Sequence, residues 1–232
     1  MSTTSRRALV TSALVIAATG LDCTRPPPPT TAPGEVARPG LFQRLSNAAD
    51  ALVARKISSQ YDESFIHYSK QYFGPQFDWR WFKAQGFAES RLDPHERSWV
   101  GARGLMQLMP TTYHEIVSQN PEFGPIDQPS WNIAAGIYYN RRLWDFWHLI
   151  PYDERLRFMF ASYNAGRGPI IKAYNIVTQR WPQDTTWANV VKVAPSIHPW
   201  IYRETIGYVR RIEEVHRILN NPFVTRAVID TL

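Results

Sequence analysis

A regular apolar stripe near the end of the chain is the feature that most constrains its fold. The stripe repeats every three or four residues and consists of Ile201, Thr205, Tyr208, Ile212, Val215 and Leu219. This spacing places the side chains on one face of an α-helix. Helical patterns also run through the chain from about residue 42, without a convincing alternating run that would indicate a strand. The sequence therefore predicts an all-α domain.

The expected helices cover residues 42–57, 61–73, 79–92, 111–119, 130–149, 152–165, 170–180, 187–193 and 201–219. Asp93-Pro94 is expected to end the third of these, because proline disfavours a helical conformation in the residue before it. Thr111, Thr112 and Glu115 resemble an N-terminal cap signature, and Gly166 is expected to stop the helix before it. In the helix over 130–149, the side chains expected on one face are Ile133, Ile137, Trp144 and Trp147.

The first 41 residues are expected to lie outside this domain. Residues 1–23 have a basic start and an apolar run from Ala8 to Ala18, which suits a signal sequence and is too short to span a membrane. Cys23 is the only cysteine, so no intramolecular disulfide is expected. Its position resembles the lipidation cysteine of bacterial lipoproteins, although Asp22 replaces the usual small residue. A proline-rich linker is expected over 24–41 and the helical domain over 42–232.

Three outcomes for the N-terminus stay open: a lipid anchor at Cys23, a secreted protein, or an uncleaved anchor. Each of them implies export to the periplasm or cell envelope. The formal net charge of +6 suits a polyanionic partner such as a cell wall or an anionic membrane. No Lys/Arg run is dense enough to favour nucleic acid as a partner.

Metal and phosphate sites are not expected. His95-Glu96 and His114-Glu115 lack the second histidine of a zinc-binding H-E-x-x-H helix. Gly101 and Gly104 lack the lysine and the length of a phosphate-binding loop. The sequence therefore predicts neither a metal nor a cofactor.

Glu89 stands out as a candidate general acid. It follows an acid-free run of aromatic and small residues and lies four residues after Gln85 and seven after Phe82, which turns it inward or to the rim of a cleft. Burial raises the pKa of a carboxyl group, and the negative end of the helix dipole acts in the same direction. A carboxyl that keeps its proton near neutral pH suits general acid catalysis. Taken alone, a solvated or capping glutamate is the commoner case.

Four short motifs occur in order along the chain. They are Glu89-Ser90, Gly104-Leu105-Met106-Gln107, Ala161-Ser162-Tyr163-Asn164-Ala165-Gly166 and Glu204-Thr205-Ile206-Gly207-Tyr208-Val209. Each motif alone also fits an ordinary turn, helix end or core segment. Together they closely resemble the catalytic domain of family 1 lytic transglycosylases, which has a lysozyme-like fold similar to goose-type lysozyme. The stretch from Trp187 to Pro195 looks most similar to the membrane-bound type F branch of that family.

The resemblance implies a substrate and a reaction. The substrate would be peptidoglycan, cleaved at the β-1,4 bond between N-acetylmuramic acid (MurNAc) and N-acetylglucosamine (GlcNAc). The product would be a 1,6-anhydro-MurNAc end, formed without water. Glu89 would protonate the leaving oxygen and then, as the carboxylate, take the proton of the muramyl C6 hydroxyl. The N-acetyl group of the substrate would act as the internal nucleophile.

The resemblance also assigns supporting residues. Those expected to bind the substrate or to support Glu89 are Ser90, Met106, Gln107, Tyr163, Asn164 and Tyr208. Ser90 would help to place Glu89 or the reacting sugar, Gln107 would hydrogen-bond the glycan, and Met106 would form an apolar wall. Tyr163 and Asn164 would line the reacting subsite. Tyr208 would donate its hydroxyl to Glu89, which favours the carboxylate and opposes the effect of burial on the pKa.

Two other functions remain as alternatives. Ordinary glycosidases use two carboxylates, but no second acid stands in an equivalent motif near Glu89. Asp93 is expected to end the helix, and Glu204 is expected to pair with a cation or a helix end. A single acid fits substrate-assisted chemistry. A goose-type lysozyme-like hydrolase would share the fold and use water, and a catalytically silent wall-binding protein would keep the fold without turnover.

Overall fold

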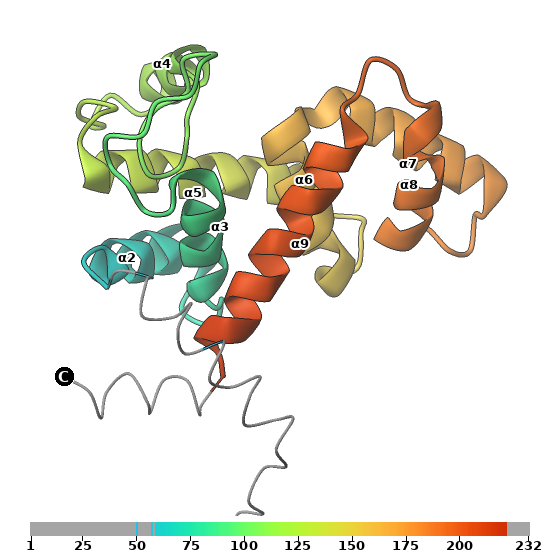
Figure 1. The fold of residues 1–232 in the computed structure, drawn as a ribbon, viewed down its shortest axis with the longest axis horizontal. Helices are drawn as coiled ribbons and strands as arrows, with labels where there is room; N and C mark the ends of the chain where they lie inside the picture. Colours follow the sequence, from blue (N-terminus) through green and yellow to red (C-terminus); the bar gives the residue numbers. More distant parts are fainter. Residues whose placement is uncertain (1–49, 51–56, 58, 222–232) are drawn as a thin grey trace, which may run out of the picture. The chain divides into compact units, whose positions relative to one another are not determined.

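The computed structural model describes residues 50, 57 and 59–221, most of which lie in helices (Figure 1). The elements are α2 (Asp62–Phe73), α3 (Arg80–Ser90), α4 (Pro110–Gln119), α5 (Pro129–Phe146), α6 (Tyr152–Ala165), α7 (Arg167–Arg180), α8 (Trp187–Val193), the 3-10 helix η1 (Ala194–Ser196) and α9 (Tyr202–Leu219). Over this described segment no β-strand occurs, only isolated bridges at Arg103. The all-α prediction is confirmed.

Parts of the predicted organisation lie outside the described residues. These are the leader over 1–23, the linker over 24–41 and, apart from residues 50 and 57, the helix over 42–57. Among the helices that the structure does describe, none is both long enough and apolar enough to cross a membrane.

Most helix ends lie within two residues of their predicted positions, and the exceptions have local causes. Helix α7 begins three residues early, because Gly166 alone, with φ of 75°, separates it from α6. Pro169 then falls in the first turn of α7, where its missing N–H removes no helical hydrogen bond. The predicted cap of α4 is wrong: the helix starts at Pro110 after an extended Met109 and has no side-chain cap hydrogen bond. Helix α5 ends at Phe146 rather than at residue 149.

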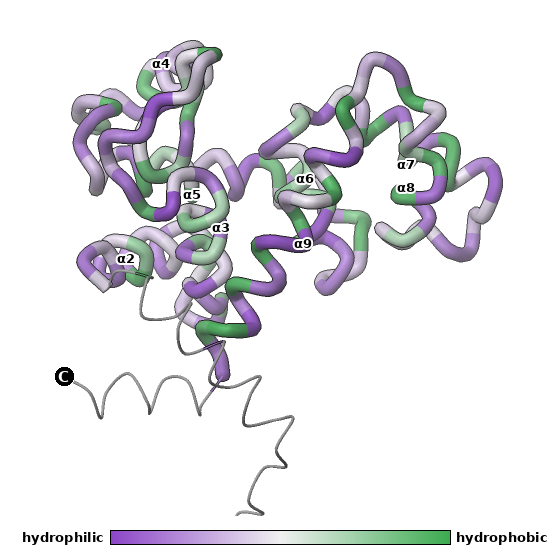
Figure 2. Tube along the Cα trace, in the orientation of Figure 1, coloured by the Kyte–Doolittle hydropathy of each residue, from purple (hydrophilic) through white to green (hydrophobic). Residues whose placement is uncertain are grey.

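Helix α9 brings the end of the described chain against α3 and α6, while α5 packs against α2 and α6 (Figure 1). Figure 2 shows hydrophobic and hydrophilic residues alternating along α9, as expected for an amphipathic helix. Thr205, Tyr208, Ile212 and Val215 from the predicted stripe are buried. Ile201 precedes the helix and is 70% exposed. The packing of α9 on α3 brings Tyr208 and Glu89 onto neighbouring helices.

A clasp of three side chains joins the far end of α9 to the start of α3. The His216 ring stacks on Trp81 with ring centroids 3.5 Å apart, and His216 Nε2 lies 2.8 Å from Asp78 Oδ2. Burial disfavours ionisation of Asp78, but hydrogen bonds from His216 and from the backbone N–H of Arg80 outweigh it and hold the pKa of Asp78 below its usual range. The clasp limits rotation of α9 against α3.

Candidate active site

Glu89 is the second-last residue of α3, at the negative end of the helix dipole. The helix ends two residues earlier than predicted, because Arg91 and Leu92 adopt left-handed conformations with φ of 57° and 64°. Asp93 accepts a hydrogen bond from the backbone N–H of His95 at 2.8 Å, a turn contact that fits its predicted role in ending the helix. Two consecutive non-glycine residues at positive φ are unusual, and such backbone is concentrated at functional sites.

The carboxyl group of Glu89 keeps its proton at neutral pH. The residue is partly exposed along a cavity, but the surrounding protein removes most of the water from its carboxyl. This burial raises the pKa of Glu89 to about 8, against the opposing hydrogen bond from Tyr208 and with help from the negative charge of Glu204. At pH 7 the group therefore holds a proton that it can donate.

Tyr208 supplies the hydrogen-bond donor to Glu89. Its hydroxyl lies 2.5 Å from Glu89 Oε1, which is the contact that the resemblance implied. Burial and the negative charge of Glu89 raise the pKa of Tyr208 well above its usual value, so the phenol stays protonated. With Oε1 occupied by Tyr208, the proton of a neutral Glu89 is left on Oε2.

The cavity beside Glu89 has a volume of about 650 Å³. Its lining residues come from the end of α3, the following loop and α9, and are Phe87, Ala88, Glu89, Ser90, Arg91, Glu96 and Arg211. A second carboxylate, Glu96, thus borders the same space as Glu89. In the part of the chain that the structure covers, no group of three or more His, Cys, Asp or Glu side chains is placed to hold a metal ion.

The Gly104-Leu105-Met106-Gln107 motif forms a tight loop that three side chains hold in place. Ser90 Oγ lies 3.0 Å from the Leu105 carbonyl oxygen, and the Tyr163 hydroxyl donates to the Met106 carbonyl at 2.8 Å. Asn132 on α5 accepts from the Met106 N–H at 2.8 Å and donates to the Arg103 carbonyl at 3.0 Å. Ser90 and Tyr163 therefore bind the loop directly, rather than standing free for the sugar.

Gly104 allows the loop to approach α5 this closely. Its φ is 74°, and a Cβ atom at this position would lie 2.6 Å from Asn132 Nδ2. A side chain at position 104 would therefore meet both an unfavourable backbone conformation and a clash. The motif's glycine is required by the Asn132 contact as much as by the turn.

Met106 and Gln107 lie differently from the sequence prediction. Met106 is completely buried and faces Gly136 of α5, where an added Cβ would come within 2.7 Å of its side chain. Met106 therefore anchors the loop against α5 and does not form an apolar wall of the site. The Gln107 amide donates to the carbonyls of Glu96 and Gly104 at 3.1 and 3.0 Å. Both of its N–H groups are used, so a contact with glycan would have to use its carbonyl oxygen.

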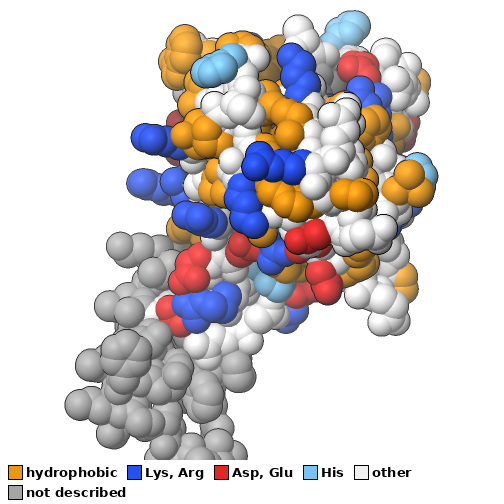
Figure 3. All heavy atoms as spheres, turned by 90° about the vertical axis from the view of Figure 1, so that its right-hand side faces the viewer, with side chains coloured by type: hydrophobic (Ala, Val, Ile, Leu, Met, Phe, Trp, Pro, Cys, Tyr) orange, Lys and Arg blue, Asp and Glu red, His pale blue; other side chains and the backbone are white. Residues whose placement is uncertain are grey.

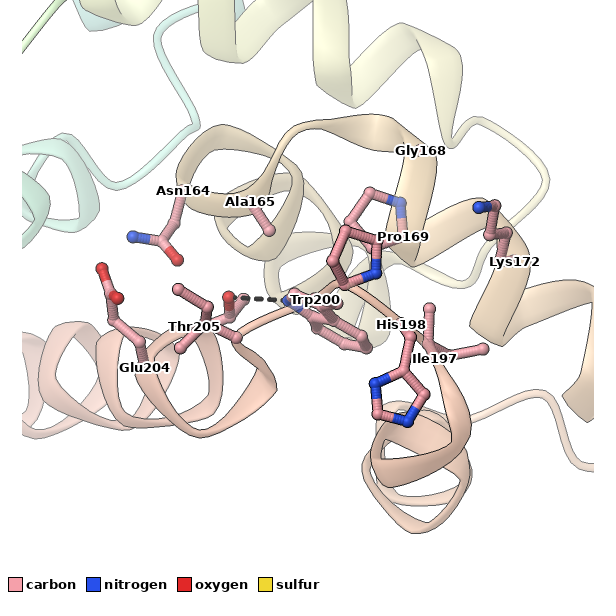
Figure 4. Close-up of a pocket in the computed structure, with 12 residues that line it drawn as sticks. Asn164, Ala165, Gly168, Pro169, Lys172, Ile197, His198, Trp200, Glu204 and Thr205 are labelled. Atoms are coloured by element: carbon pink, nitrogen blue, oxygen red, sulfur yellow. Dashed lines mark hydrogen bonds between the residues drawn. The ribbon is translucent and has the colours of Figure 1, made fainter. Parts of the chain in front are cut away.

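Asn164 lines a second cavity, which has a volume of about 440 Å³ (Figure 4). The close-up shows Asn164 and Glu204 at one end, Lys172 and His198 at the other, and Trp200 between them. Trp200 Nε1 donates to Thr205 Oγ1 at 2.9 Å, which fixes the indole as a wall. A groove with an acidic end, an aromatic wall and a basic end suits a polar ligand.

Comparison with known families adds an independent observation. Residues 73–184 match the transglycosylase SLT domain. The chain therefore contains a transglycosylase SLT domain. The match includes Glu89 and the loop at Gly104, but Glu204 and Tyr208 on α9 lie beyond it.

Curated relatives match about two thirds of this chain. The chain is 33% identical to membrane-bound lytic murein transglycosylase F of Shewanella sediminis over 162 residues, which cover 68% of this chain and 32% of the relative. It is 30% identical to the protein of the same name from Vibrio cholerae, over 65% of this chain and 28% of the relative. The chain thus spans about a third of the length of the curated relatives it matches.

Solved structures show the same fold. The 70 kDa soluble lytic transglycosylase of Escherichia coli superposes with a TM-score of 0.55 at 23% identity, over 72% of this chain and 26% of that one. The lytic transglycosylase Slt of Pseudomonas aeruginosa superposes with a TM-score of 0.55 at 22% identity, over the same shares of each chain. The SLT domain therefore has the lysozyme-like fold that the sequence predicted.

Three buried amides around the SLT site were not singled out from the sequence. Gln85 and Asn140 are 0% exposed and hydrogen-bond each other, and Asn132 is 1% exposed. A weak signal was present, because Asn132 and Asn140 stand eight residues apart on α5, within its apolar face. Their partners lie on other helices, so the sequence alone did not reveal their function.

Proposed function

We propose that this chain is a peptidoglycan lytic transglycosylase. It cleaves the MurNAc-β-1,4-GlcNAc bond without water and leaves a 1,6-anhydro-MurNAc end. The observation that carries the proposal is Glu89: in a domain of the SLT family, one carboxyl with a pKa of about 8 borders a cavity and receives a hydrogen bond from Tyr208. The names of the curated relatives, lytic murein transglycosylases, support the same reaction.

In the first step, Glu89 Oε2 gives its proton to the glycosidic oxygen as the bond to the muramyl C1 breaks. GlcNAc leaves with a 4-hydroxyl group, and the carbonyl oxygen of the muramyl N-acetyl group bonds to C1. Tyr208 stabilises the carboxylate that forms, because a hydrogen bond to a charged acceptor is stronger than one to a neutral acceptor.

In the second step, the Glu89 carboxylate takes the proton of the muramyl C6 hydroxyl. The C6 oxygen bonds to C1, the N-acetyl oxygen leaves C1, and the 1,6-anhydro ring is complete. Glu89 is protonated again, so one carboxyl serves as acid and then as base. Glu89 is the proposed catalytic residue. Ser90, Tyr163 and Met106 support the loop beside it, while Asn164 and Gln107 offer polar contacts to the glycan.

Digestion products test this proposal. Purified peptidoglycan treated with the protein should give anhydro-muropeptides as the main products in mass spectrometry. A digest by a hydrolytic lysozyme provides the control, since its products carry reducing ends with one more water. Mainly reducing-end products would favour the goose-type lysozyme-like hydrolase, in which Glu96 or Glu204 would position a water. No release at all would favour a silent wall-binding protein.

Glu204 is the acid to test as a second catalytic group. It is exposed in the first turn of α9, where the helix dipole favours a negative charge, and among the described residues it has no ion-pair partner within 4.0 Å, so the predicted cation is not seen. Glu204→Gln should lower the pKa of Glu89, because a neighbouring like charge disfavours the carboxylate. We expect the alkaline limb of the rate–pH profile to move to lower pH.

At pH 6, where Glu89 is protonated in both proteins, Glu204→Gln should keep its rate within about threefold of the wild-type rate. Glycan turnover measured between about pH 5 and 9 gives both readouts. Glu214→Gln is a matched control on the same helix, because Glu214 pairs with Arg217. A loss of more than about a hundredfold at pH 6 would make Glu204 a second catalytic acid.

The place of action is proposed to be the cell envelope, with the chain exported and attached to the membrane through Cys23. The curated relatives are named membrane-bound, and Figure 3 shows Lys and Arg side chains set among hydrophobic ones on the face at the α7 and α8 side. The net charge of +6 suits an anionic wall. Peptidoglycan is the proposed partner, and no role for nucleic acid is proposed.

Cys23→Ala should move the protein from the membrane fraction to the soluble envelope fraction, since a lipid chain on the thiol would supply most of the membrane affinity. Fractionation in high salt separates lipid anchoring from charge attraction, which salt screens. A wild-type protein found only in the soluble fraction, or a Cys23→Ala variant that stays with the membrane in high salt, would contradict the anchor.

A further inference from the structure

A chain of hydrogen bonds runs from α5 through α3 to the hydroxyl that binds Glu89. Asn140 Nδ2 donates to Gln85 Oε1 at 2.7 Å, Gln85 Nε2 donates to the Tyr208 hydroxyl oxygen at 3.0 Å, and Tyr208 donates to Glu89 Oε1 at 2.5 Å. Both amides are 0% exposed and Tyr208 is 6% exposed. Asn140 and Gln85, the first two residues of this series of hydrogen bonds, do not border the cavity beside Glu89.

Asn140, the residue of this series that is farthest from Glu89, fixes the direction of the hydrogen bonds. Asn140 Nδ2 also donates to the Gly136 carbonyl of α5 at 3.0 Å. If the Asn140 amide were turned over, its oxygen would face two oxygen acceptors, the Gly136 carbonyl and Gln85 Oε1. That arrangement is repulsive in a buried site. The Asn140 amide therefore has one allowed orientation, even though its Oδ1 is left without a hydrogen-bond partner.

The orientation of the Asn140 amide determines that of the Gln85 amide, which in turn determines where the Tyr208 hydroxyl points. Because Gln85 Oε1 accepts from Asn140, its Nε2 group must face the Tyr208 oxygen. A hydroxyl oxygen that accepts from Gln85 has its own hydrogen free to point elsewhere. Among residues 50, 57 and 59–221, Glu89 Oε1 is the acceptor that the structure gives this hydrogen. If Gln85 were turned over, its Oε1 would compete with Glu89 for the same hydrogen.

We propose that Gln85 and Asn140 are positioning residues of the proposed transglycosylase site, which keep the Tyr208 hydroxyl donating to Glu89 through both proton transfers. The inference rests on the proposed function for the steps it serves. The Glu89 carboxylate formed in the first step is stabilised while the Tyr208 hydroxyl points toward it. The two buried amides hold the hydroxyl in that direction without contacting the sugar.

The other groups that face Glu89 are unchanged by substitutions at 85 and 140. On α9 they are Glu204, Tyr208 and Arg211, on α6 Tyr163, and at the end of α3 and in the next loop Arg91 and Glu96. A change in the titration of Glu89 in these variants would therefore report on the hydrogen bond that Tyr208 makes.

The test uses substitutions that keep side-chain volume, Gln85→Met and Asn140→Leu, in the full chain. We expect Gln85→Met to lower kcat about tenfold, as for loss of one oriented hydrogen bond, with KM within about twofold because neither residue borders the cavity. Asn140→Leu should lower kcat by about threefold, because Gln85 then loses its fixed direction but not its amide. The double variant should be no worse than Gln85→Met, since Asn140 acts only through Gln85.

Asn189→Leu is the matched control. Asn189 is also a buried asparagine, 2% exposed, and its amide donates to the Asp184 carbonyl at 2.8 Å, on α8 and away from Glu89. It should keep the wild-type kcat. Asn140→Leu leaves the Gln85 oxygen without its hydrogen-bond donor. If this variant fails to fold for that reason, the double variant supplies the test, since it leaves neither amide in the core.

A readout that needs no turnover separates this inference from the proposed function. The Glu89 carboxyl can be followed by carbon NMR of protein labelled at the glutamate carboxyl carbon, assigned with Glu89→Gln. Loss of a directed donor to the carboxylate should raise the Glu89 midpoint in Gln85→Met and in the double variant. A wild-type protein without transglycosylase products would sink the proposed function but leave this titration test intact. Folded variants with wild-type kcat and an unchanged midpoint, or additive losses in the double variant, would overturn the inference.

Discussion

Glu89→Gln is expected to lower the rate of glycan cleavage by about a thousandfold or more, because one side chain supplies both the proton for the leaving oxygen and the base for the C6 hydroxyl. The amide cannot donate a proton to a glycosidic oxygen at neutral pH or remove one afterwards. The measurement is the initial rate of anhydro-muropeptide release from purified peptidoglycan. Binding of the variant to peptidoglycan in a pull-down assay should be unchanged, since the shape and polarity of the side chain are kept.

The same variant should be more stable than the wild type, which shows that lost activity is not lost folding. In the folded protein the pKa of Glu89 is raised to about 8 from an ordinary 4.5. Between these values the folded state binds more protons than the unfolded state, so this group lowers stability as pH rises through that window. The advantage of Glu89→Gln should therefore grow from about pH 4.5 to 8 and then level off, reaching on the order of 1–2 kcal/mol after allowance for partial exposure.

Equal cleavage by Glu89→Gln and wild type would show that Glu89 is not the proton donor. The wall-binding alternative would then be favoured, provided that binding to peptidoglycan is retained. Thermal unfolding at about pH 5 and 8 supplies the stability comparison. A variant that is inactive and also less stable at both pH values would leave the catalytic role without support.

Tyr208→Phe is expected to lower kcat by about 10- to 100-fold, the usual range for a lost hydrogen bond to a charged group. The hydroxyl donates to Glu89 Oε1 at 2.5 Å, so its removal withdraws support from the carboxylate formed in the first step. That bond also lowers the pKa of Glu89. Without it the pKa should rise above about 8, and the alkaline limb of the rate–pH profile should move to higher pH, opposite to the shift expected for Glu204→Gln.

Tyr202→Phe is the control for Tyr208→Phe, because Tyr202 lies at the start of the same helix and its hydroxyl bonds only to the exposed Arg203 among the described residues. It should keep the wild-type rate and pH profile. An unchanged pH profile in Tyr208→Phe, with a rate like that of wild type, would show that the contact between the phenol and the carboxyl has no part in the reaction.

Local signals in the sequence were sufficient for most of the helices. Helix α6 spans Tyr152–Ala165 and α8 spans Trp187–Val193, as predicted, because glycine, proline and apolar spacing act over a few residues. The errors also have local causes. At α4, Pro110 starts the helix without a side-chain cap, and at α7 one glycine was enough to separate two helices.

The site depended on contacts that sequence patterns do not show. Burial of Glu89 was predicted from its helix, but Tyr208 lies 119 residues further on, and its contact was implied only by the family resemblance. Met106 was expected to form an apolar wall of the site. Its packing on Gly136 was not predicted, because Gly136 stands 30 residues further on and no sequence pattern links the two. Gln85 and Asn140 are 55 residues apart, and each looks like an ordinary helical residue.

The loop at Gly104 is tied to α3, α5 and α6 by Ser90, Asn132 and Tyr163. The loop beside Glu89 is therefore fixed from three helices, and a substitution at any of these three residues would remove one of the contacts that hold it. Lys172 and His198 line the second cavity, are exposed, and take no part in the contacts that hold this loop. Attempts to change which glycan strands the proposed transglycosylase accepts should therefore begin at Lys172 and His198.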